Sequence, residues 1–273
     1  MKTLTKNLIN AAVLTAFSLA PANVKANDIF IGVKGPTNHQ IDSRIGYSER
    51  SNSNNITTNT LTNNEVLKYW DKWKSDSWGD FGVFGFTNIP IYKRVDNGTN
   101  QNSGFGDLVL GVGPRGKLNF GKNSFNFLSY AGANIPTGDV HEKPALGNDR
   151  TDLKLGLFGT YLTENNKKEI DAQFEYTFAG RNSKGVKGLD EISAGLIAGG
   201  RLDKDNLVRI AAGINSRFKN NDKGWDYAYG PRAVIRVTPP KSKYHLEIVG
   251  DYDLTAKNMP KGFGVTFQHR RNF

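Results

Sequence analysis

The stretch KKEIDAQFEYTF, residues 167–178, alternates apolar and polar side chains with a period of two. Every second residue from position 170 is apolar: Ile170, Ala172, Phe174, Tyr176 and Phe178. The residues between them are Asp171, Gln173, Glu175 and Thr177. Because successive side chains of a β-strand point to opposite faces, the stretch predicts a strand with one apolar and one charged face. The apolar face meets a protein core in a soluble sheet, or lipid in an outer-membrane barrel whose charged face lines the interior.

The same alternation recurs in five further segments. They are TDLKLGLFGTYL, DEISAGLIAGGRL, NLVRIAAGINSRF, WDYAYGPRAVIRV and YHLEIVGDYDL. Earlier segments are less regular: WGDFGVFGFTNIPIYKR, residues 78–94, is apolar on both faces in places and gives no orientation. The segment TLTNNEVLKYWDKW, residues 60–73, fits either a polar strand or a short helix. Six successive segments of one design predict a single large sheet.

Counting the ambiguous segment as a strand gives twelve strands. Their predicted ranges are 40–50, 57–71, 78–94, 104–118, 124–135, 151–162, 168–179, 190–202, 207–218, 225–237, 244–255 and 262–273. From the fourth strand onward, the tight turns NFGKN, TENNKK, DKDN and TPPKSK alternate with longer loops, among them PTGDVHEKPALGNDR and KNNDKG. An even strand number, with short turns on one rim and longer loops on the other, is typical of outer-membrane barrels. The sequence therefore predicts an all-β fold, a closed antiparallel transmembrane β-barrel.

The two ends of the chain carry signals for export and assembly. Lys2 and Lys6 precede an apolar run and then small residues, which is the order of a secretory signal peptide. We expect the signal peptide at 1–26, with Ala22 as the alternative cleavage position, a periplasmic or lumenal segment at 27–39, and the barrel at 40–273. The last strand ends in Phe273, a terminal aromatic that resembles the assembly signal of outer-membrane proteins. His269 and Arg271 fall on its outward face, so we expect them in the periplasmic interface.

Composition excludes several classes of protein and partner. The chain has no cysteine, so disulfides and thiolate metal sites are excluded. A mean hydropathy of −0.51 argues against a helical membrane bundle. The formal charge is +10, but basic residues are interspersed with acids, which together with export argues against nucleic acid as a partner. We expect outer-membrane lipid, lipopolysaccharide, the barrel-assembly machinery and a small-molecule solute as partners, and the oligomeric state is left open.

Charged residues on the predicted inner faces are the candidate lumen residues. The basic candidates are Arg201, Arg209, Arg217, Arg232 and Arg236, and the acidic ones are Asp171, Glu175, Glu191, Glu247 and Asp251. Arg201 and Arg209 flank a tight turn and should lie opposite each other near the periplasmic end, with Arg232 and Arg236 on the next strand. Like charges in that arrangement destabilise a sheet unless acids or a ligand offset them. The set is interpreted either as a mixed-charge ladder that stiffens a polar lumen or as a constriction that prefers anions.

Two motifs resemble a known family. SGFGDLVLGVGPRGKL and NFLSYAGANIPTGD resemble the G-x-G-D strand and the later P-T-G-D turn of the MetA-pathway of phenol degradation family, and residues 78–94 look like its third strand. By motif position the matching residues are Gly104, Gly106, Asp107, Pro136, Thr137, Gly138 and Asp139. The resemblance implies export, an outer-membrane barrel and passage of small hydrophobic compounds.

Motifs for catalysis are weak. GVGPRG, Gly111–Gly116, has dinucleotide-motif spacing but is followed by strand and turn residues where that fold needs a helix, so no cofactor is expected. No histidine has a serine two residues after it, as barrel phospholipases require, and no metal-ligand spacing occurs. Asp251 and Asp253 with Asp139 and His141 supply protease residue types, but in reversed order and on nearly opposite strands.

We therefore expect a non-enzymatic channel in the cell outer membrane that passes small hydrophobic, aromatic or anionic solutes passively. The alternative is a non-transporting barrel whose outer loops bind a partner or lipopolysaccharide, and an outer-membrane hydrolase is the third interpretation.

Overall fold

The computed structural model describes residues 39–52, 54–76, 79–141, 144–163, 167–202, 208–221, 224–238 and 244–272. The predicted signal peptide, the predicted segment 27–39 except His39, and Phe273 lie outside the described residues. Within those ranges no helix has the length and apolar character needed to cross a membrane.

The described chain consists of β-strands joined by turns and loops. The strands are β1 (His39–Ser51), β2 (Thr57–Asp76), β3 (Gly79–Asp96), β4 (Gln101–Gly104), β5 (Leu108–Phe120), β6 (Asn123–Ile135), β7 (Asp152–Thr163), β8 (Lys168–Phe178), β9 (Glu191–Arg201), β10 (Val208–Asn221), β11 (Gly224–Val237), β12 (Tyr244–Tyr252), β13 (Thr255–Lys257) and β14 (Lys261–Asn272). Twelve of them form the barrel wall, while the short β4 and β13 pair only with β3 and β11. The predicted all-β fold and strand number are confirmed.

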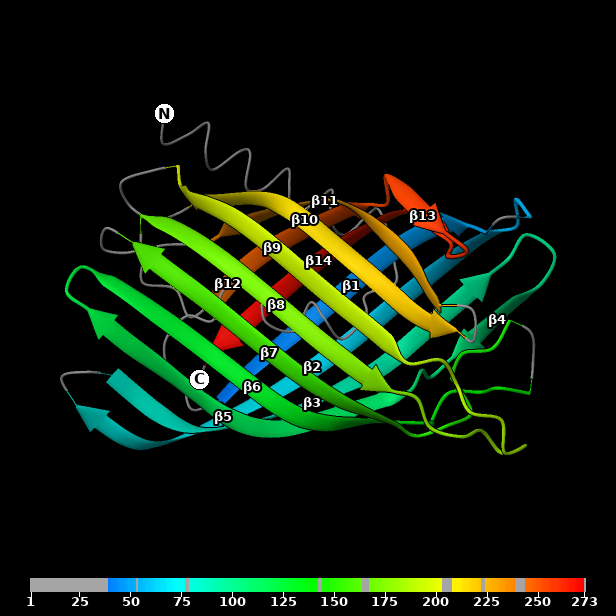
Figure 1. Ribbon diagram of the computed structural model, residues 1–273, viewed down its shortest axis with the longest axis horizontal. Helices are drawn as coiled ribbons and strands as arrows, with labels where there is room; N and C mark the ends of the chain where they lie inside the picture. Colours follow the sequence, from blue (N-terminus) through cyan, green and yellow to red (C-terminus); the bar gives the residue numbers. More distant parts are fainter. Residues whose placement is uncertain are drawn as a thin grey trace.

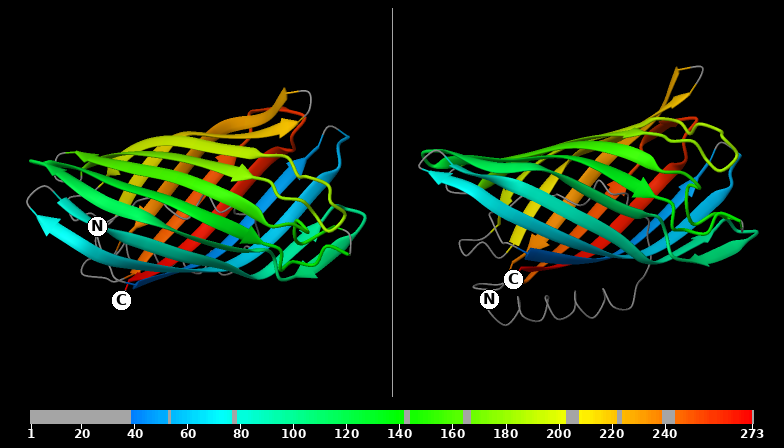
Figure 2. Two further views of the ribbon diagram at one scale, coloured as in Figure 1. Left: turned by 60° about the horizontal axis from the view of Figure 1, so that its bottom comes forward. Right: turned by 90° about the horizontal axis from the view of Figure 1, so that it is seen from below.

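The barrel closes between its first and last strands. Each wall strand pairs antiparallel with its neighbours in the order β1-β2-β3-β5-β6-β7-β8-β9-β10-β11-β12-β14, and β1 then pairs with β14 from Gln40↔Asn272 to Ser51↔Lys261. The strands are strongly tilted, and β4 and β13 lie at the rim opposite the C-terminus (Figure 1). The long β2–β3 hairpin projects from the other rim (Figure 2). Closure leaves no unpaired edge among the twelve wall strands in the described part of the chain, which is the condition for crossing lipid with strands.

Three details differ from the sequence prediction. The ambiguous segment at 60–73 is a strand, β2, and it extends to Asp76. The strand expected at 104–118 is broken, because Gly104 ends β4 and β5 begins only at Leu108. The loop expected at KNNDKG is instead a continuation of β10 and β11, which remain paired to Asn221↔Gly224. In the last two cases the strand ends where backbone pairing ends at the rim of the barrel. The alternation of side chains does not reveal where that pairing ends.

The apolar faces of the C-terminal strands point outward. On β8 the outward Ile170 and Phe174 are 46% and 40% exposed, while the inward Glu169 and Glu175 are 3% and 4% exposed. The same sense holds for the exposed leucines and isoleucines Leu153, Leu155, Leu157, Leu196, Ile210, Ile214 and Ile235. An apolar exterior around a charged interior is the inverse of a soluble protein and is what a lipid bilayer requires. The chain is an outer-membrane β-barrel, as the sequence predicted.

Candidate functional site

One wall of the lumen carries an ionic network centred on Asp42. Its carboxylate accepts hydrogen bonds from Arg44 Nη2 at 3.1 Å, Arg270 Nε at 3.1 Å and Gln268 Nε2 at 2.9 Å, and from Lys68 Nζ. Asp42 is fully buried, and these partners come from β1, β2 and β14. Three cations thus surround one carboxylate, which leaves this part of the lumen electropositive.

A second network continues around the same wall. Arg236 Nε donates to Glu247 Oε2 at 2.6 Å, and its Nη1 lies 3.9 Å from Glu169 Oε1. Arg209 Nη1 donates to the other oxygen of Glu169. Because Glu169 lies on β8 and Glu247 on β12, the contacts span the lumen side of five neighbouring strands. A network with this many ion pairs stiffens the inner wall and fixes the positions of its charges.

The predicted arginine cluster is assembled by the register of three strands. Arg201↔Arg209 and Arg209↔Arg236 are direct partners, so three guanidinium groups follow one another across β9, β10 and β11. Arg232 lies four residues from Arg236 along β11, opposite Asp251. Like charges in adjacent positions require compensation, and the carboxylates of Glu169 and Glu247 supply it here.

Three predicted lumen residues lie elsewhere, at the extracellular end of the barrel. Arg217 Nη2 binds Asp253 at 2.7 Å, and Arg50 binds both Asp251 and Asp253, at 2.9 and 3.1 Å. Glu191 pairs with Lys219 at 2.7 Å. Asp251 and Asp253, the acids that resemble protease residues, are thus held in ion pairs with arginine. Asp139 and His141 lie in the β6–β7 loop, where the backbone N–H of His141 donates to Asp139 Oδ1.

The remaining two acidic candidates, Asp171 and Glu175, face the lumen from β8. Glu175 accepts from Lys154 Nζ at 2.8 Å and from the hydroxyl of Tyr130, and Asp171 accepts from Thr160 Oγ1. Because Tyr130 lies on β6 and Thr160 on β7, these contacts place both acids next to a second, apolar wall of the lumen.

That second wall is formed by β2, β3, β5, β6 and β7. Its buried side chains are Val66, Phe84, Phe86, Val109, Leu128, Tyr130 and Phe158. The rings form a continuous path, with centroids 5.9 Å apart for Phe84–Phe86, 4.9 Å for Phe86–Tyr130 and 6.0 Å for Tyr130–Phe158. Twelve strands closed in this order set β5 opposite β11, so the aromatic wall faces the arginine wall.

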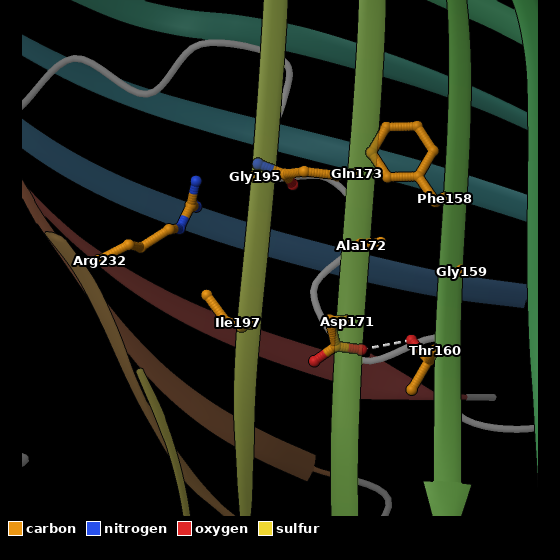
Figure 3. Close-up of a pocket in the computed structure, with 9 residues that line it drawn as sticks. All are labelled: Phe158, Gly159, Thr160, Asp171, Ala172, Gln173, Gly195, Ile197 and Arg232. Carbon is orange, nitrogen blue, oxygen red and sulfur yellow. Dashed lines mark hydrogen bonds between the residues drawn. The ribbon is translucent and has the colours of Figure 1, made fainter. Parts of the chain in front are cut away.

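A pocket lies where the two walls meet. It is lined by Phe158, Thr160, Asp171, Gln173, Ile197 and Arg232, together with Gly159, Ala172 and Gly195. Figure 3 shows the ring of Phe158 and the guanidinium group of Arg232 on two sides of the same opening, with the amide of Gln173 between them. The cavity is about 20 Å³, room for about one water molecule, with a flat apolar surface on one side and a positive charge on the other.

Sequence reasoning missed Asp42, Arg44, Lys68, Glu169, Gln268, Arg270 and the aromatic wall. Asp42 and Gln268 are 226 residues apart along the chain and meet only because β14 closes against β1. The available signal was the shared parity of Asp42 and Arg44 on β1 with Gln268 and Arg270 on the last strand.

The motif residues form a structural tie at the extracellular rim. Asp107 accepts from Gly138 N at 3.1 Å and Asn148 N at 2.8 Å, and Thr137 Oγ1 donates to Gly106 O at 2.7 Å. A Cβ on Gly147 would lie 2.3 Å from Asp107 Oδ1, so this close approach needs glycine. The tie fixes the β6–β7 loop against the start of β5, and Lys93 Nζ adds a bond to Leu146 O at 2.6 Å. Pro136 and Gly104 flank this tie at the end of β6 and of β4.

Comparison with known proteins gives a family and a fold. The sequence matches the family described as "Putative MetA-pathway of phenol degradation" over residues 33–268. A search of curated proteins finds no match.

Three solved structures illustrate the fold. An outer membrane channel from Pseudomonas putida F1 is similar with a TM-score of 0.66 and 16% identity, covering 92% of this chain and 100% of that one. The β domain of the Bordetella autotransporter BrkA gives 0.51 and 13%, covering 86% and 99%. The translocator domain of autotransporter NalP from Neisseria meningitidis gives 0.51 and 9%, covering 98% of both chains. At such identities the likeness shows the fold alone.

Proposed function

This chain belongs to the MetA-pathway of phenol degradation family, and from that premise we propose that it is an outer-membrane channel through which small solutes diffuse without a cofactor. The Pseudomonas putida protein with the same fold is described as an outer membrane channel, which supports this role. Part of the lumen wall is polar and charged, as a path for solutes through a barrel requires.

The solute class follows from the pocket between the two walls. Phe158 and Arg232 line it together, and this observation carries the proposal. The cavity of about 20 Å³ is smaller than a ring, so a small aromatic compound would displace lumen side chains as it passes, with its ring against Phe158 and an anionic or electron-rich end near Arg232. We therefore assign small aromatic solutes, with a preference for those carrying negative charge. The hydrolase interpretation gains no support, because the candidate acids Asp251 and Asp253 are held in ion pairs with arginine.

The preference for anions is mild because the buried charges nearly balance. The buried basic residues are Arg44, Lys68, Arg115, Arg209, Arg217, Arg232, Arg236 and Arg270, and the buried acidic ones are Asp42, Asp152, Glu169, Asp171, Glu175, Asp226, Glu247 and Asp253. Those eight of each sign cancel as a sum over the described residues. Their distribution is uneven, however, because three cations surround Asp42 and three arginines adjoin across β9–β11.

Reversal potentials across a salt gradient test the proposal on the refolded protein. We expect conductance with mild anion preference, lost in the double variant Arg201→Glu with Arg209→Glu. Because Arg209 pairs with Glu169, a heat-modifiable gel shift must show that the variant is folded, and Arg232→Gln is a gentler second variant with the same direction of change. Addition of benzoate should reduce the salt current more than acetate does. A parent that prefers cations contradicts the selectivity, and a folded parent without conductance contradicts the channel.

A further inference from the structure

The outer surface of the barrel has one polar strip that the channel role does not use. On β2 the outward Leu67 and Tyr69 are 42% and 48% exposed, and Glu65 shares their parity. Ser43 on β1 is the register partner of Glu65, and its hydroxyl donates to Glu65 Oε2 at 3.0 Å. Ser43 is also the register partner of the exposed His269 on β14. Three neighbouring strands thus present His269, Ser43 and Glu65 in one row toward lipid.

Ser43 and Glu65 of this row lie in the middle of the apolar belt, and His269 lies on its periplasmic side, next to Tyr244. Tyr47, whose hydroxyl donates to Glu49 and Asn59, marks the extracellular aromatic girdle on β1, four residues from Ser43. Tyr69 marks the periplasmic girdle and pairs with His39, which is four residues from Ser43 on the other side. Among the described strands, Glu65 is the only acid on the outer face between these girdles. An ionisable group there is costly to expose to hydrocarbon and indicates a partner.

The row could instead be a serine hydrolase site, but its contacts have the wrong order. A catalytic histidine must accept the serine proton, whereas Ser43 donates to Glu65. His269 instead stacks on Tyr244 of β12, with ring centroids 5.4 Å apart and planes 15° apart. The β1–β2 and β1–β14 ladders are paired without interruption around Ser43, so no backbone N–H is available for an oxyanion.

We propose that the strip is the centre of an interface with a second copy of this chain. Two copies inserted in the same orientation are related by a two-fold axis along the membrane normal, and such an interface brings residue i of one copy against residue j of the other in both directions. Adjacent strands are about 4.8 Å apart, so Glu65 and His269 lie at about that distance on opposite sides of Ser43. With the axis at Ser43, Glu65 of each copy lies across the interface from the His269 of the other copy. Because the strands are tilted by about 40°, the two residues differ by about 6 Å in height along the membrane normal, and their long side chains span this step.

The surroundings suit close contact of two barrels. Ser43 is the small residue at the axis, which allows the two β1 strands to approach, as small residues do in membrane interfaces. Ile41 and Ile45 flank it on β1, with Leu67 on β2 and Phe267 on β14, so apolar packing surrounds the polar centre. The pairing removes the carboxylate from lipid and gives it a hydrogen-bond donor from the imidazole ring in place of hydrocarbon. The Ser43–Glu65 bond then holds the carboxylate toward the axis.

Disulfide cross-linking tests the position of the axis, because the chain contains no cysteine. In the full mature chain refolded into phosphatidylethanolamine and phosphatidylglycerol vesicles, Ser43→Cys should form a covalent dimer on oxidation. Ala172→Cys is the matched control, since it is an exposed outward position on β8 on the far side of the barrel, and it should stay monomeric. A folded Ser43→Cys protein that does not cross-link, or equal cross-linking at both positions, overturns the proposal.

Charge exchange tests the pairing itself. Glu65→His alone should weaken dimerisation at least tenfold, and Glu65→His with His269→Glu should restore it, because the two-fold places each residue against the other. Glu65→Leu keeps the lipid face apolar, so it should remain folded and be monomeric by single-molecule photobleaching in the same vesicles. A wild-type protein that is monomeric in those vesicles, or a double exchange that does not restore the dimer, overturns the proposal. Conductance per barrel should be unchanged in Glu65→Leu, which separates this test from that of the channel.

Discussion

The strands β2, β3, β5 and β6 differ from the strands β8–β12 in what their inner faces carry. On β8 the outward Phe174 meets lipid and the inward Asp171 and Glu175 face a charged lumen. On β3 the outward Val83 also faces the lipid side, but the inward Phe84 and Phe86 build an aromatic wall. Both groups obey the same pleat, so the difference lies only in the lumen.

This difference teaches when alternation identifies a barrel. A period of two is visible only if one face is polar, and lipid always demands that the outer face be apolar. Where the lumen wall is aromatic, both faces are apolar and the period disappears from the sequence. This explains why the segment of β3, which carries Phe84 and Phe86, gave no orientation from its sequence.

The largest expected loss of stability comes from truncating a side chain of the aromatic wall. Phe84 is 2% exposed and lies 5.9 Å from Phe86 between ring centroids. Phe84→Ala should destabilise the barrel by about 3–5 kcal/mol, because it removes packing and leaves a cavity that the closed wall cannot fill. Guanidinium unfolding in detergent micelles, followed by tryptophan fluorescence, measures this.

The matched control is Phe178→Ala on β8. Phe178 points outward and is 45% exposed, so acyl chains or detergent can occupy the vacated space. We expect a loss well below that of Phe84→Ala. Equal losses would mean that β3 and β8 do not differ in the way their faces indicate.

The fold could be predicted because its cause is local, whereas the site is not local. The alternation on β7–β12 gave the strands to within a few residues and their outward faces correctly, since lipid and a charged lumen impose opposite demands on adjacent residues. The arginines of β9–β11 could be foreseen for the same reason. The network at Asp42 could not, because it depends on the closure of β14 on β1. The orientation of β3 could not be predicted, because the lumen-facing Phe84 and Phe86 are as apolar as the residues that face lipid.

A smaller effect is expected from inserting charge on the two faces of β8 and on the outer face of β10. Phe174→Arg or Ile210→Arg should cost about 2–4 kcal/mol near the bilayer midplane and reduce assembly. Gln173→Arg should be tolerated, because Gln173 lines the lumen pocket. The fraction of heat-modifiable protein in isolated outer membranes reports the ranking. If Gln173→Arg were the most harmful of the three, the assignment of faces on β8 would be wrong.

The smallest effect concerns the rim, where the two parts of the barrel also differ. The β3–β5 ladder ends at Asn88↔Val109, and beyond it Gly106 N bonds to Pro90 O at 3.4 Å. The β8–β9 ladder instead continues to Thr177↔Glu191. Each part of this rim has a carboxylate that ties a loop: Asp107 accepts from Gly138 N and Asn148 N, and Asp190 Oδ1 accepts from Ala179 N at 2.9 Å.

Removing the two ties should therefore open regions of different size, with the larger region at Asp107. Asp107→Ala leaves two backbone donors without their acceptor, at a local cost of about 1–3 kcal/mol, and the interrupted β3–β5 ladder offers nothing to confine the opening. We expect faster amide hydrogen exchange in the β6–β7 loop and at the start of β5, with the rest of the barrel unchanged. Asp190→Ala should accelerate exchange only in the β8–β9 loop, because paired strands continue directly below it. If the Asp190 variant opened as far as the Asp107 variant, the broken β3–β5 ladder would not distinguish these two parts of the rim, and Asp107 would have no structural role beyond that of Asp190.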